Sequence, residues 1–333
     1  MSFVLEQNFI ENSFKHAREL LSNGKEQISS QYRGYNWSDI PVPEYWKLNL
    51  PFNQIAYDYC STGRYLFLNK VKNIPTNPSF SSVLGKVTDR ALLGILKSSI
   101  TYFSETKVSE NSIYSYLHKQ KESLLSEIDK EITKQDEFIS INEFKTILSI
   151  CDKILSYEIS SIATRVRYHI SKSQSISKDT LRQKVLPLLI EPQISASDLG
   201  FSDLMTPDFF YPEEKAVGDF KSFKYDKNDK AYKIAIAGYA LAYEYTENKD
   251  VDLGFVLHLD SLNKKYVPIF HLDVFVVNDN LRKLFIQKRN ERLNMISAAM
   301  QGLLAHEPGL PKACPRSCPY ITTCEPRNID ENK

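Results

Sequence analysis

The stretch DLMTPDFFYPEEKAVGDFKSF, residues 203–223, decides the fold. Its two short apolar runs, LMTPDFFYP and AVGDFKSF, are separated by turn-prone residues, and PEEKA is short enough for a hairpin connection. We therefore expect two paired antiparallel strands, with Asp208 on the first and Asp219 on the second. Residues two apart on a strand share a face, so the side chains of Asp219 and Lys221 point the same way.

Strand and helix patterns continue on both sides of this hairpin. LPLLIEPQI precedes it as another short strand, and KAYKIAIAGYALAYEYT follows it as a helix. VDLGFVLHLD and YVPIFHLDVFVV predict two more strands, and NDNLRKLFIQKRNERLNMISAAMQGLL predicts a long helix that opens with an Asn/Asp cap. This order of elements predicts an α/β sheet core.

The rest of the chain favours helices and divides by composition. We expect an N-terminal helical region at 1–104, a helical insertion at 105–185, the sheet core at 186–305 and a cysteine segment at 306–333. The insertion is rich in Ser, Lys, Glu and Ile with apolar spacing near 3.6, and we expect its helices to end near the Ser-rich SKSQSISKD. Cys151 lies on an apolar stripe there, which favours a small buried hydrophobe.

Composition narrows the class of protein. The 333 residues are 42% apolar and 25% charged, as in ordinary soluble domains, and no apolar run reaches the length of a membrane span. The N-terminus reads as an amphipathic helix without the features of a signal peptide, so we expect a cytoplasmic location and no membrane partner. A net charge of +1 leaves nucleic-acid binding to local patches.

One basic run is a candidate for such a patch. Lysines recur at every third position of KSFKYDKNDKAYK, namely Lys221, Lys224, Lys227, Lys230 and Lys233. They could line a rim that contacts phosphates, or they could form a solvated loop and helix start, because Asp226 and Asp229 partly neutralise them.

The acids of the hairpin suit metal-dependent phosphodiester cleavage. Paired strands can bring Asp208 and Asp219 close enough to share a hard divalent cation, and the Lys221 ammonium can steady a water or the charge on a phosphate. The alternative is a pair of surface acids at strand ends.

Three of the five cysteines form a second candidate site in CPRSCPYITTC, residues 314–324. The spacing Cys314-x₃-Cys318-x₅-Cys324 differs from the two Cys-x₂-Cys knuckles of a zinc ribbon. A fourth thiolate would come from Cys60 or Cys151. Four thiolates suit a [4Fe–4S] cluster and structural zinc equally well on ligand count.

GKVTDRAL, DLMTPDFFYP, VGDFKSF, AGYALAYEY and the terminal cysteines, in this order, resemble the motifs of RecB-type nucleases. More narrowly they resemble the CRISPR-associated iron–sulfur exonucleases, in particular the longer archaeal type I-A branch, and the bacterial AddB nuclease shares the cysteine arrangement. The resemblance runs from Tyr57 to Cys324, without 105–185. It implies a restriction-endonuclease-like mixed β-sheet core with flanking helices, a helical insertion and a C-terminal iron–sulfur clasp.

The resemblance implies roles for individual residues. A Mg²⁺ or Mn²⁺ ion would be held by carboxylates and one backbone carbonyl, with further positions for catalysis: Asp89, Asp208 (Asp203 as runner-up), Asp219, the Phe220 carbonyl, Lys221 and Tyr239. Asp89 stands where the family's Gly-x-x-x-His segment, matched at Gly85, has its histidine. In the family's Gln-x-x-x-Tyr helix, Ala235 replaces the glutamine.

For the cysteines, the resemblance implies a structural [4Fe–4S] cluster that joins both ends of the chain. Its ligands would be Cys60, Cys314, Cys318 and Cys324. The spacing between Cys314 and Cys318 is one residue longer than the family's usual Cys-x₂-Cys.

The implied function is a DNA exonuclease of CRISPR adaptation that trims fragments before spacer integration. Its partners would be DNA, with single-stranded ends or overhangs, and the adaptation integrase proteins. One alternative is a catalytically weak or inactive subunit for DNA-end binding or assembly, which the substitutions at Asp89 and Ala235 favour. Another is a zinc-stapled nucleic-acid-binding protein.

Overall fold

The computed structural model describes residues 7–36, 50–57, 60, 63–76, 78–105, 108–134, 139–173, 175–201, 204–222, 230–262, 268–301, 318–320 and 323. Its α-helices are α1 (Gln7–Ser22), α2 (Phe52–Ala56), α3 (Arg64–Leu66), α4 (Phe80–Glu105), α5 (Glu110–Thr133), α6 (Ile141–Lys172), α7 (Lys178–Val185), α8 (Ala231–Glu247) and α9 (Asp279–Met300). Shorter helical turns are η1 (Ser30–Tyr32), η2 (Gly34–Asn36), η4 (Phe67–Val71) and η5 (Ser197–Leu199). Within these ranges, none of the helices combines the length and the apolar character needed to cross a membrane.

Five strands form one mixed sheet in the order β1 (Leu189–Ile190), β2 (Phe209–Tyr211), β3 (Ala216–Lys221), β4 (Leu253–Leu262) and β5 (Pro268–Val276). The strands β3 and β4 run parallel and α8 connects them, as a crossover between parallel strands requires, whereas the other neighbours are antiparallel. The α/β class and the order of elements around the hairpin are therefore confirmed.

Two strands are shorter than the apolar runs that predict them. Only Leu189 and Ile190 of LPLLIEPQI form β1, because Pro187 and Pro192 flank them and cannot donate to a ladder. Likewise, β2 begins one residue after Asp208, which follows Pro207. Asp208 therefore lies at the entrance to β2 and not within it.

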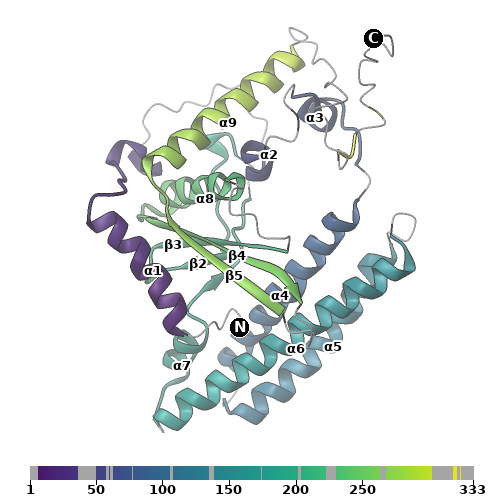
Figure 1. Ribbon diagram of the computed structural model, residues 1–333, viewed down its shortest axis with the longest axis vertical. Helices are drawn as coiled ribbons and strands as arrows, with labels where there is room; N and C mark the ends of the chain where they lie inside the picture. The colour runs from purple at the N-terminus through teal and green to yellow at the C-terminus, as the bar shows by residue number, and fades with distance from the viewer. Residues whose placement is uncertain are drawn as a thin grey trace.

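The two faces of the sheet pack against different helices (Figure 1). Phe210, Val217 and Val256 face α2, α8 and α9 and belong to one core cluster. Phe209 and Phe220 point to the opposite face, where the core includes residues of α1, α4, α5 and α6. Because side chains alternate along β3, its polar residues at 219 and 221 share the α8 face with Val217.

The helices α4, α5 and α6 pack side by side beneath the sheet (Figure 1). A capping box opens α6, since the Ser140 hydroxyl accepts from the Glu143 N–H at 3.3 Å and the Glu143 carboxylate accepts from the Ser140 N–H at 2.9 Å. Cys151 of α6 is fully buried among apolar side chains, and this burial raises the pKa of its thiol to about 12. It behaves as the small buried hydrophobe that the sequence predicts.

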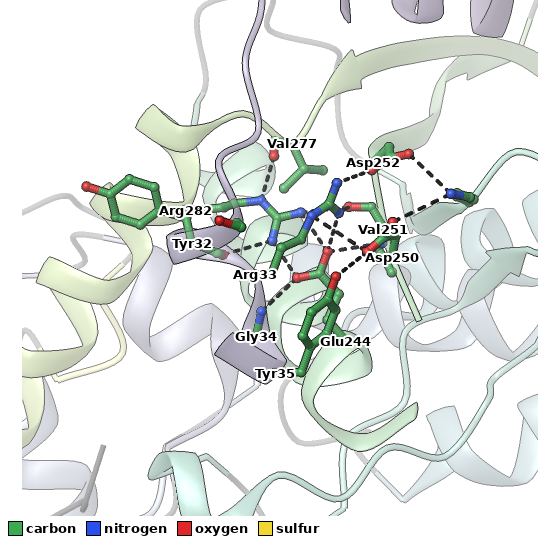
Figure 2. Close-up of polar contacts among 12 residues, drawn as sticks. Tyr32, Arg33, Gly34, Tyr35, Glu244, Asp250, Val251, Asp252, Val277 and Arg282 are labelled. Carbon is green, nitrogen blue, oxygen red and sulfur yellow. Dashed lines mark hydrogen bonds and ion pairs between the residues drawn. The ribbon is translucent and has the colours of Figure 1, made fainter. Parts of the chain in front are cut away.

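A buried carboxylate joins the N-terminal segment to α8 and α9 (Figure 2). Glu244, on the last turn of α8, is fully buried and accepts from two guanidinium groups: from Arg282 at 2.6 and 3.1 Å, and from Arg33 at 2.6 Å. The backbone N–H groups of Gly34 and Val251 also donate to it, at 2.9 and 3.0 Å. These contacts fix residues far apart in the sequence at the edge of the sheet core.

The N-terminal segment approaches α8 closely at Gly34. A Cβ atom at this position would lie 2.0 Å from the carbonyl oxygen of Leu241, which is backbone and cannot move aside. Only glycine fits there, so η2 lies directly against the helix that also carries Glu244.

Candidate active site

The two hairpin acids lie opposite each other. Phe209 pairs with Gly218 in the antiparallel ladder, so the next residues outward, Asp208 and Asp219, face one another across β2 and β3. Their carboxyl groups share a hydrogen bond, and Asp208 also accepts from the Phe220 N–H at 2.6 Å. The hairpin expected from the sequence thus brings both acids to one point.

The surroundings of the two acids shift their pKa values in opposite directions. Burial, together with the charge of Asp219, raises the pKa of Asp208 well above its ordinary value. Burial also acts to raise the pKa of Asp219, but the Lys221 ammonium and the hydrogen bond from Asp208 outweigh it, so that this pKa falls below its ordinary value. Asp208 therefore holds a proton more tightly than Asp219 does.

Lys221 lies on the same face, and its ammonium contacts Asp219 directly. Burial acts to lower its pKa, but the charges of Asp219 and Asp208 raise it above the ordinary lysine value. Tyr57 adds to this effect, so Lys221 is also near the segment that precedes Cys60. Lys221 is a permanent cation beside the acid pair.

Asp89 approaches the pair from α4. Burial and the charges of Asp219 and Glu191 raise its pKa to about 7, although Lys221 acts in the opposite direction. These mutual effects place Asp89 within electrostatic range of the two hairpin acids. Gly85, the matched glycine of the family segment, lies one helical turn earlier on α4.

Tyr239 reaches the same site from α8. It is half-buried, and desolvation followed by the charges of Asp219 and Asp208 raises the pKa of its hydroxyl above the ordinary value. The ring of Phe52 packs edge-on against it at 4.6 Å between centroids. One turn before it, Ala235 is buried and offers no polar group where the family has glutamine.

The sequence did not reveal two further ionisable groups near the site. Glu191 follows β1 with a positive φ of 46°, and its backbone N–H donates to the Asp208 carbonyl at 2.9 Å. His258 of β4 pairs in register with Lys221 and is only 4% exposed. A polar residue inside the apolar run VDLGFVLHLD was the one available signal for His258, and nothing local marked Glu191.

The lysine run does not form one rim within the described residues. Lys233 pairs with Asp273 at 3.0 Å, Lys221 belongs to the acid site, and Lys230 is exposed. Lys224 and Lys227 lie outside the described residues, as does Asp203. Contact of these lysines with DNA remains a prediction.

The acid site suits a hard divalent cation. No three His, Cys, Asp or Glu side chains in the described ranges already converge tightly enough to enclose an ion. However, Asp208 and Asp219 bring two carboxyl groups into contact, and such a set of oxygen ligands suits a hard divalent cation. The residues therefore fit Mg²⁺ or Mn²⁺ by their chemistry.

Two of the four expected cluster ligands lie in one corner of the fold, where Figure 1 shows the C-terminal piece beside α3. Cys318 packs with Leu68 and Tyr320 of a small apolar cluster that also includes Tyr65. Cys60 lines a narrow cavity whose wall includes Tyr65. Cys314 and Cys324 lie outside the described residues. Cys60 and Cys318 are both half-buried, and Tyr65, which lines the cavity with Cys60, packs against the same small cluster as Cys318, an arrangement that fits a common site.

Hydrogen bonds anchor this corner. The Tyr320 hydroxyl donates to the Ile74 carbonyl at 2.7 Å and accepts from the Asn69 side chain at 3.0 Å. The rings of Tyr65 and Tyr320 meet edge-on at 5.3 Å. The segment after Cys318 is therefore held on the turns that follow Cys60.

Comparison with known proteins identifies the family. The model of the family CRISPR-associated exonuclease Csa1 matches residues 8–327. The CRISPR-associated exonuclease Csa1 of Saccharolobus solfataricus is 24% identical over 322 residues, which cover 94% of this chain and 99% of the relative. Its namesake from Thermoproteus tenax is 22% identical over 310 residues, covering 92% and 95% of the two chains. The chain therefore belongs to the Csa1 family of CRISPR-associated exonucleases.

Proposed function

We propose that the protein is a divalent-metal-dependent DNA exonuclease whose active site is the Asp208–Asp219 pair. The observation that carries this proposal is the contact between the carboxyl groups of Asp208 and Asp219, with the Lys221 ammonium beside them. Asp89, Asp208 and Asp219, with the Phe220 carbonyl, would hold Mg²⁺ or Mn²⁺. The bound ion would supply Lewis-acid activation of a phosphate oxygen and of a water.

The protein's own groups would do the remaining work. The Lys221 ammonium is fixed beside Asp219, where it can steady the attacking water or stabilise the charge that develops on the phosphate. Its raised pKa keeps it charged at neutral pH. Tyr239 keeps its proton because the pKa of its hydroxyl is raised, so it can donate a hydrogen bond to substrate.

The cysteine corner would hold a structural [4Fe–4S] cluster through Cys60, Cys314, Cys318 and Cys324. Support comes from Tyr65, which lines a cavity with Cys60 and packs against the same small apolar cluster as Cys318. Tyr57 lines the cavity next to Cys60 and also acts on Lys221, so the clasp would adjoin the active site. Closing the chain between residues 60 and 314 would stabilise the fold by restricting the unfolded state.

The biological task would be the trimming of DNA ends before they are integrated as CRISPR spacers. The names of the two relatives support exonuclease action in a CRISPR setting. Single-stranded ends or overhangs would be the substrate, the adaptation integrase would be the partner, and the cytoplasm would be the site of action.

The nuclease proposal is tested by digestion of end-labelled single strands and duplexes with and without Mn²⁺. We expect metal-dependent shortening by the wild-type protein and a loss of about 1,000-fold or more in Asp219→Ala, because several kcal/mol of transition-state stabilisation disappear. Asp129→Ala, at an exposed position of α5, is the control. If Asp219→Ala cleaved as fast as wild type, this mechanism would be wrong.

A second candidate is a subunit that binds DNA ends without cutting them. The buried Ala235, at the position of the family glutamine, favours it because one polar contact to substrate is absent. Wild-type protein that binds labelled ends tightly but leaves them intact with Mn²⁺ would select this function.

The cluster is tested separately from the nuclease. We expect visible absorbance and about four iron atoms per chain in wild type, in keeping with Cys₄ ligation of [4Fe–4S]. Cys60→Ser should lose both, whereas Cys151→Ser, in the core of α6, should keep them. Zinc in place of iron in the anaerobically purified protein would contradict the proposal.

A further inference from the structure

The face of the sheet that carries Lys221 continues as a polar surface across the next two strands. In register, Lys221 pairs with His258 of β4, and His258 pairs with His271 of β5. Asp219 pairs with Val256, which in turn pairs with Asp273. Paired residues share a face, so Asp273 lies on the same side of the sheet as the acid pair.

Asp273 is a rival partner for Lys221. Adjacent strands lie about 4.8 Å apart, so about 10 Å separates the backbones of β3 and β5, a span that extended lysine and aspartate side chains can largely bridge. If Lys221 turned toward Asp273, its ammonium would leave Asp219. The proposed mechanism needs that ammonium at the acid pair.

Two residues on the first turn of α8 bind the Asp273 carboxylate. The Tyr232 hydroxyl donates to Asp273 Oδ2 at 2.8 Å, and Lys233 Nζ lies 3.0 Å from the same oxygen. The Lys233 ammonium also lies 4.7 Å from the centre of the Phe275 ring, which fixes its direction. Asp273 is thus held by a hydroxyl and a cation on the α8 side.

His258 of β4 lies in register between Lys221 of β3 and His271 of β5. Its ring meets Tyr232 edge-on at 5.1 Å, and only 4% of it is exposed. Burial, Lys221 and His271 lower the pKa of His258 to about 4 against the opposing effects of Asp273 and Asp219. It therefore places an uncharged ring close to both Lys221 and Asp273.

We propose that His258, Tyr232 and Lys233 are positioning residues that block Asp273 and so confine the Lys221 ammonium to the Asp208–Asp219 site. This inference rests on the proposed nuclease function. It assigns Lys233 to the interior of the site and not to a rim that contacts DNA phosphates. Removing the Lys233 charge would free Asp273 to draw Lys221 away.

The test uses Lys233→Met and the double variant Lys233→Met/Asp273→Asn in the full-length protein. Because Lys221 competes with a metal for Asp219, Lys233→Met should bind Mn²⁺ about threefold more tightly while kcat falls about 10-fold at unchanged KM. The double variant should return both values to near wild type. General structural damage would instead weaken Mn²⁺ binding and activity together.

Lys249→Met is the matched control, since Lys249 pairs with Glu247 at 3.7 Å at the other end of α8 and should change neither value. Binding is measured from the electron paramagnetic resonance signal of unbound Mn²⁺, which does not depend on turnover. Unchanged Mn²⁺ affinity and kcat in Lys233→Met would overturn this inference alone. A raised KM at normal kcat, unrelieved by Asp273→Asn, would assign Lys233 to DNA contact and also overturn it. Wild-type protein that bound no Mn²⁺ would overturn the proposed function, and the inference with it.

Discussion

Glu244 and the Asp208–Asp219 pair are both carboxylate sites close to α8, yet their partners differ. Glu244 accepts from two arginines and two backbone N–H groups, with contacts of 2.6 to 3.1 Å (Figure 2). Asp208 instead faces a second carboxylate, and its pKa is raised. The first site is complete within the protein, whereas at the second a single cation, Lys221, faces two carboxyl groups.

The difference separates structural charge from functional charge. A buried carboxylate is costly unless donors and cations compensate it, and the protein supplies these fully at Glu244. At the hairpin it supplies one lysine for a set of acids that includes Asp89. Such undercompensated groups concentrate at functional sites, which is why the hairpin and not the Glu244 network is the candidate for binding a cation.

The largest effect on stability is expected at the Glu244 site. Glu244→Ala leaves Arg282 buried without its main partner and should lower the free energy of unfolding by about 3–5 kcal/mol. Denaturant unfolding in the presence of a chelator measures it. Glu247→Ala, exposed on the same helix, should change the value by less than about 0.5 kcal/mol. Equal effects of the two variants would show that the Glu244 network contributes no more to stability than an exposed glutamate does.

A divalent metal should stabilise the protein through the Asp208–Asp219 pair and not through the Glu244 site. Mn²⁺ at about 100 times its Kd should raise the free energy of unfolding of wild type by about 2.7 kcal/mol, because it binds only the folded state. Asp219→Asn should lose this gain, since one ligand and its charge are absent. Denaturant unfolding of both proteins with and without Mn²⁺ measures this difference. If Mn²⁺ stabilised the variant as much as wild type, the ion would bind elsewhere.

The free energy of unfolding of the metal-free protein should depend on pH through Asp89 of the acid site. The pKa of Asp89 rises from 3.8 to about 7 on folding, so between these values the folded state keeps a proton that the unfolded state has released. Its contribution is complete below pH 3.8 and is lost as the pH rises through 7, at less than about 1.4 kcal/mol per pH unit. Unfolding curves from pH 4.5 to 8 should therefore flatten in Asp89→Asn. An unchanged slope would show that Asp89 titrates normally.

The smallest effect is expected at the rim of the Glu244 network. Tyr35 is 37% exposed and its hydroxyl donates to Asp250 at 2.5 Å. Tyr35→Phe should cost less than about 1 kcal/mol, because water can replace a hydrogen bond at the surface. Tyr114→Phe on α5, also exposed, gives the baseline for losing a tyrosine hydroxyl. A larger loss of stability would show that the hydrogen bond between Tyr35 and Asp250 belongs to the stabilising Glu244 network.

Local patterns in the sequence were sufficient for the hairpin. The alternation in AVGDFKSF and the short PEEKA turn predicted that positions 208 and 219 lie close, and the ladder register agrees. The helices around it were likewise visible from their apolar spacing. A further helix was missed, since we expected the helical section to end near the Ser-rich stretch. Ser177 there caps α7, so serine acts as a start signal and not only as a break.

The partners of the acids could not be predicted in the same way. Arg33 and Glu244 are 211 residues apart, and neither has a local signature for the other. The use of Asp273 by Tyr232 and Lys233 depends on where α8 crosses the sheet. Spacing in the sequence likewise left open whether the five lysines form a rim or a solvated loop, and helix and strand geometry assigns Lys221 and Lys233 to different acids.

The Glu244 network also orders events during synthesis. Arg33 emerges early, but its partner Glu244 follows 211 residues later and Arg282 a further 38 residues after that. The helices α4, α5 and α6 contact one another over short sequence separations, so they can fold on the nascent chain while the N-terminal segment waits. Completion of the sheet core is therefore a late event, and until then the strands of the sheet are open to unwanted pairing.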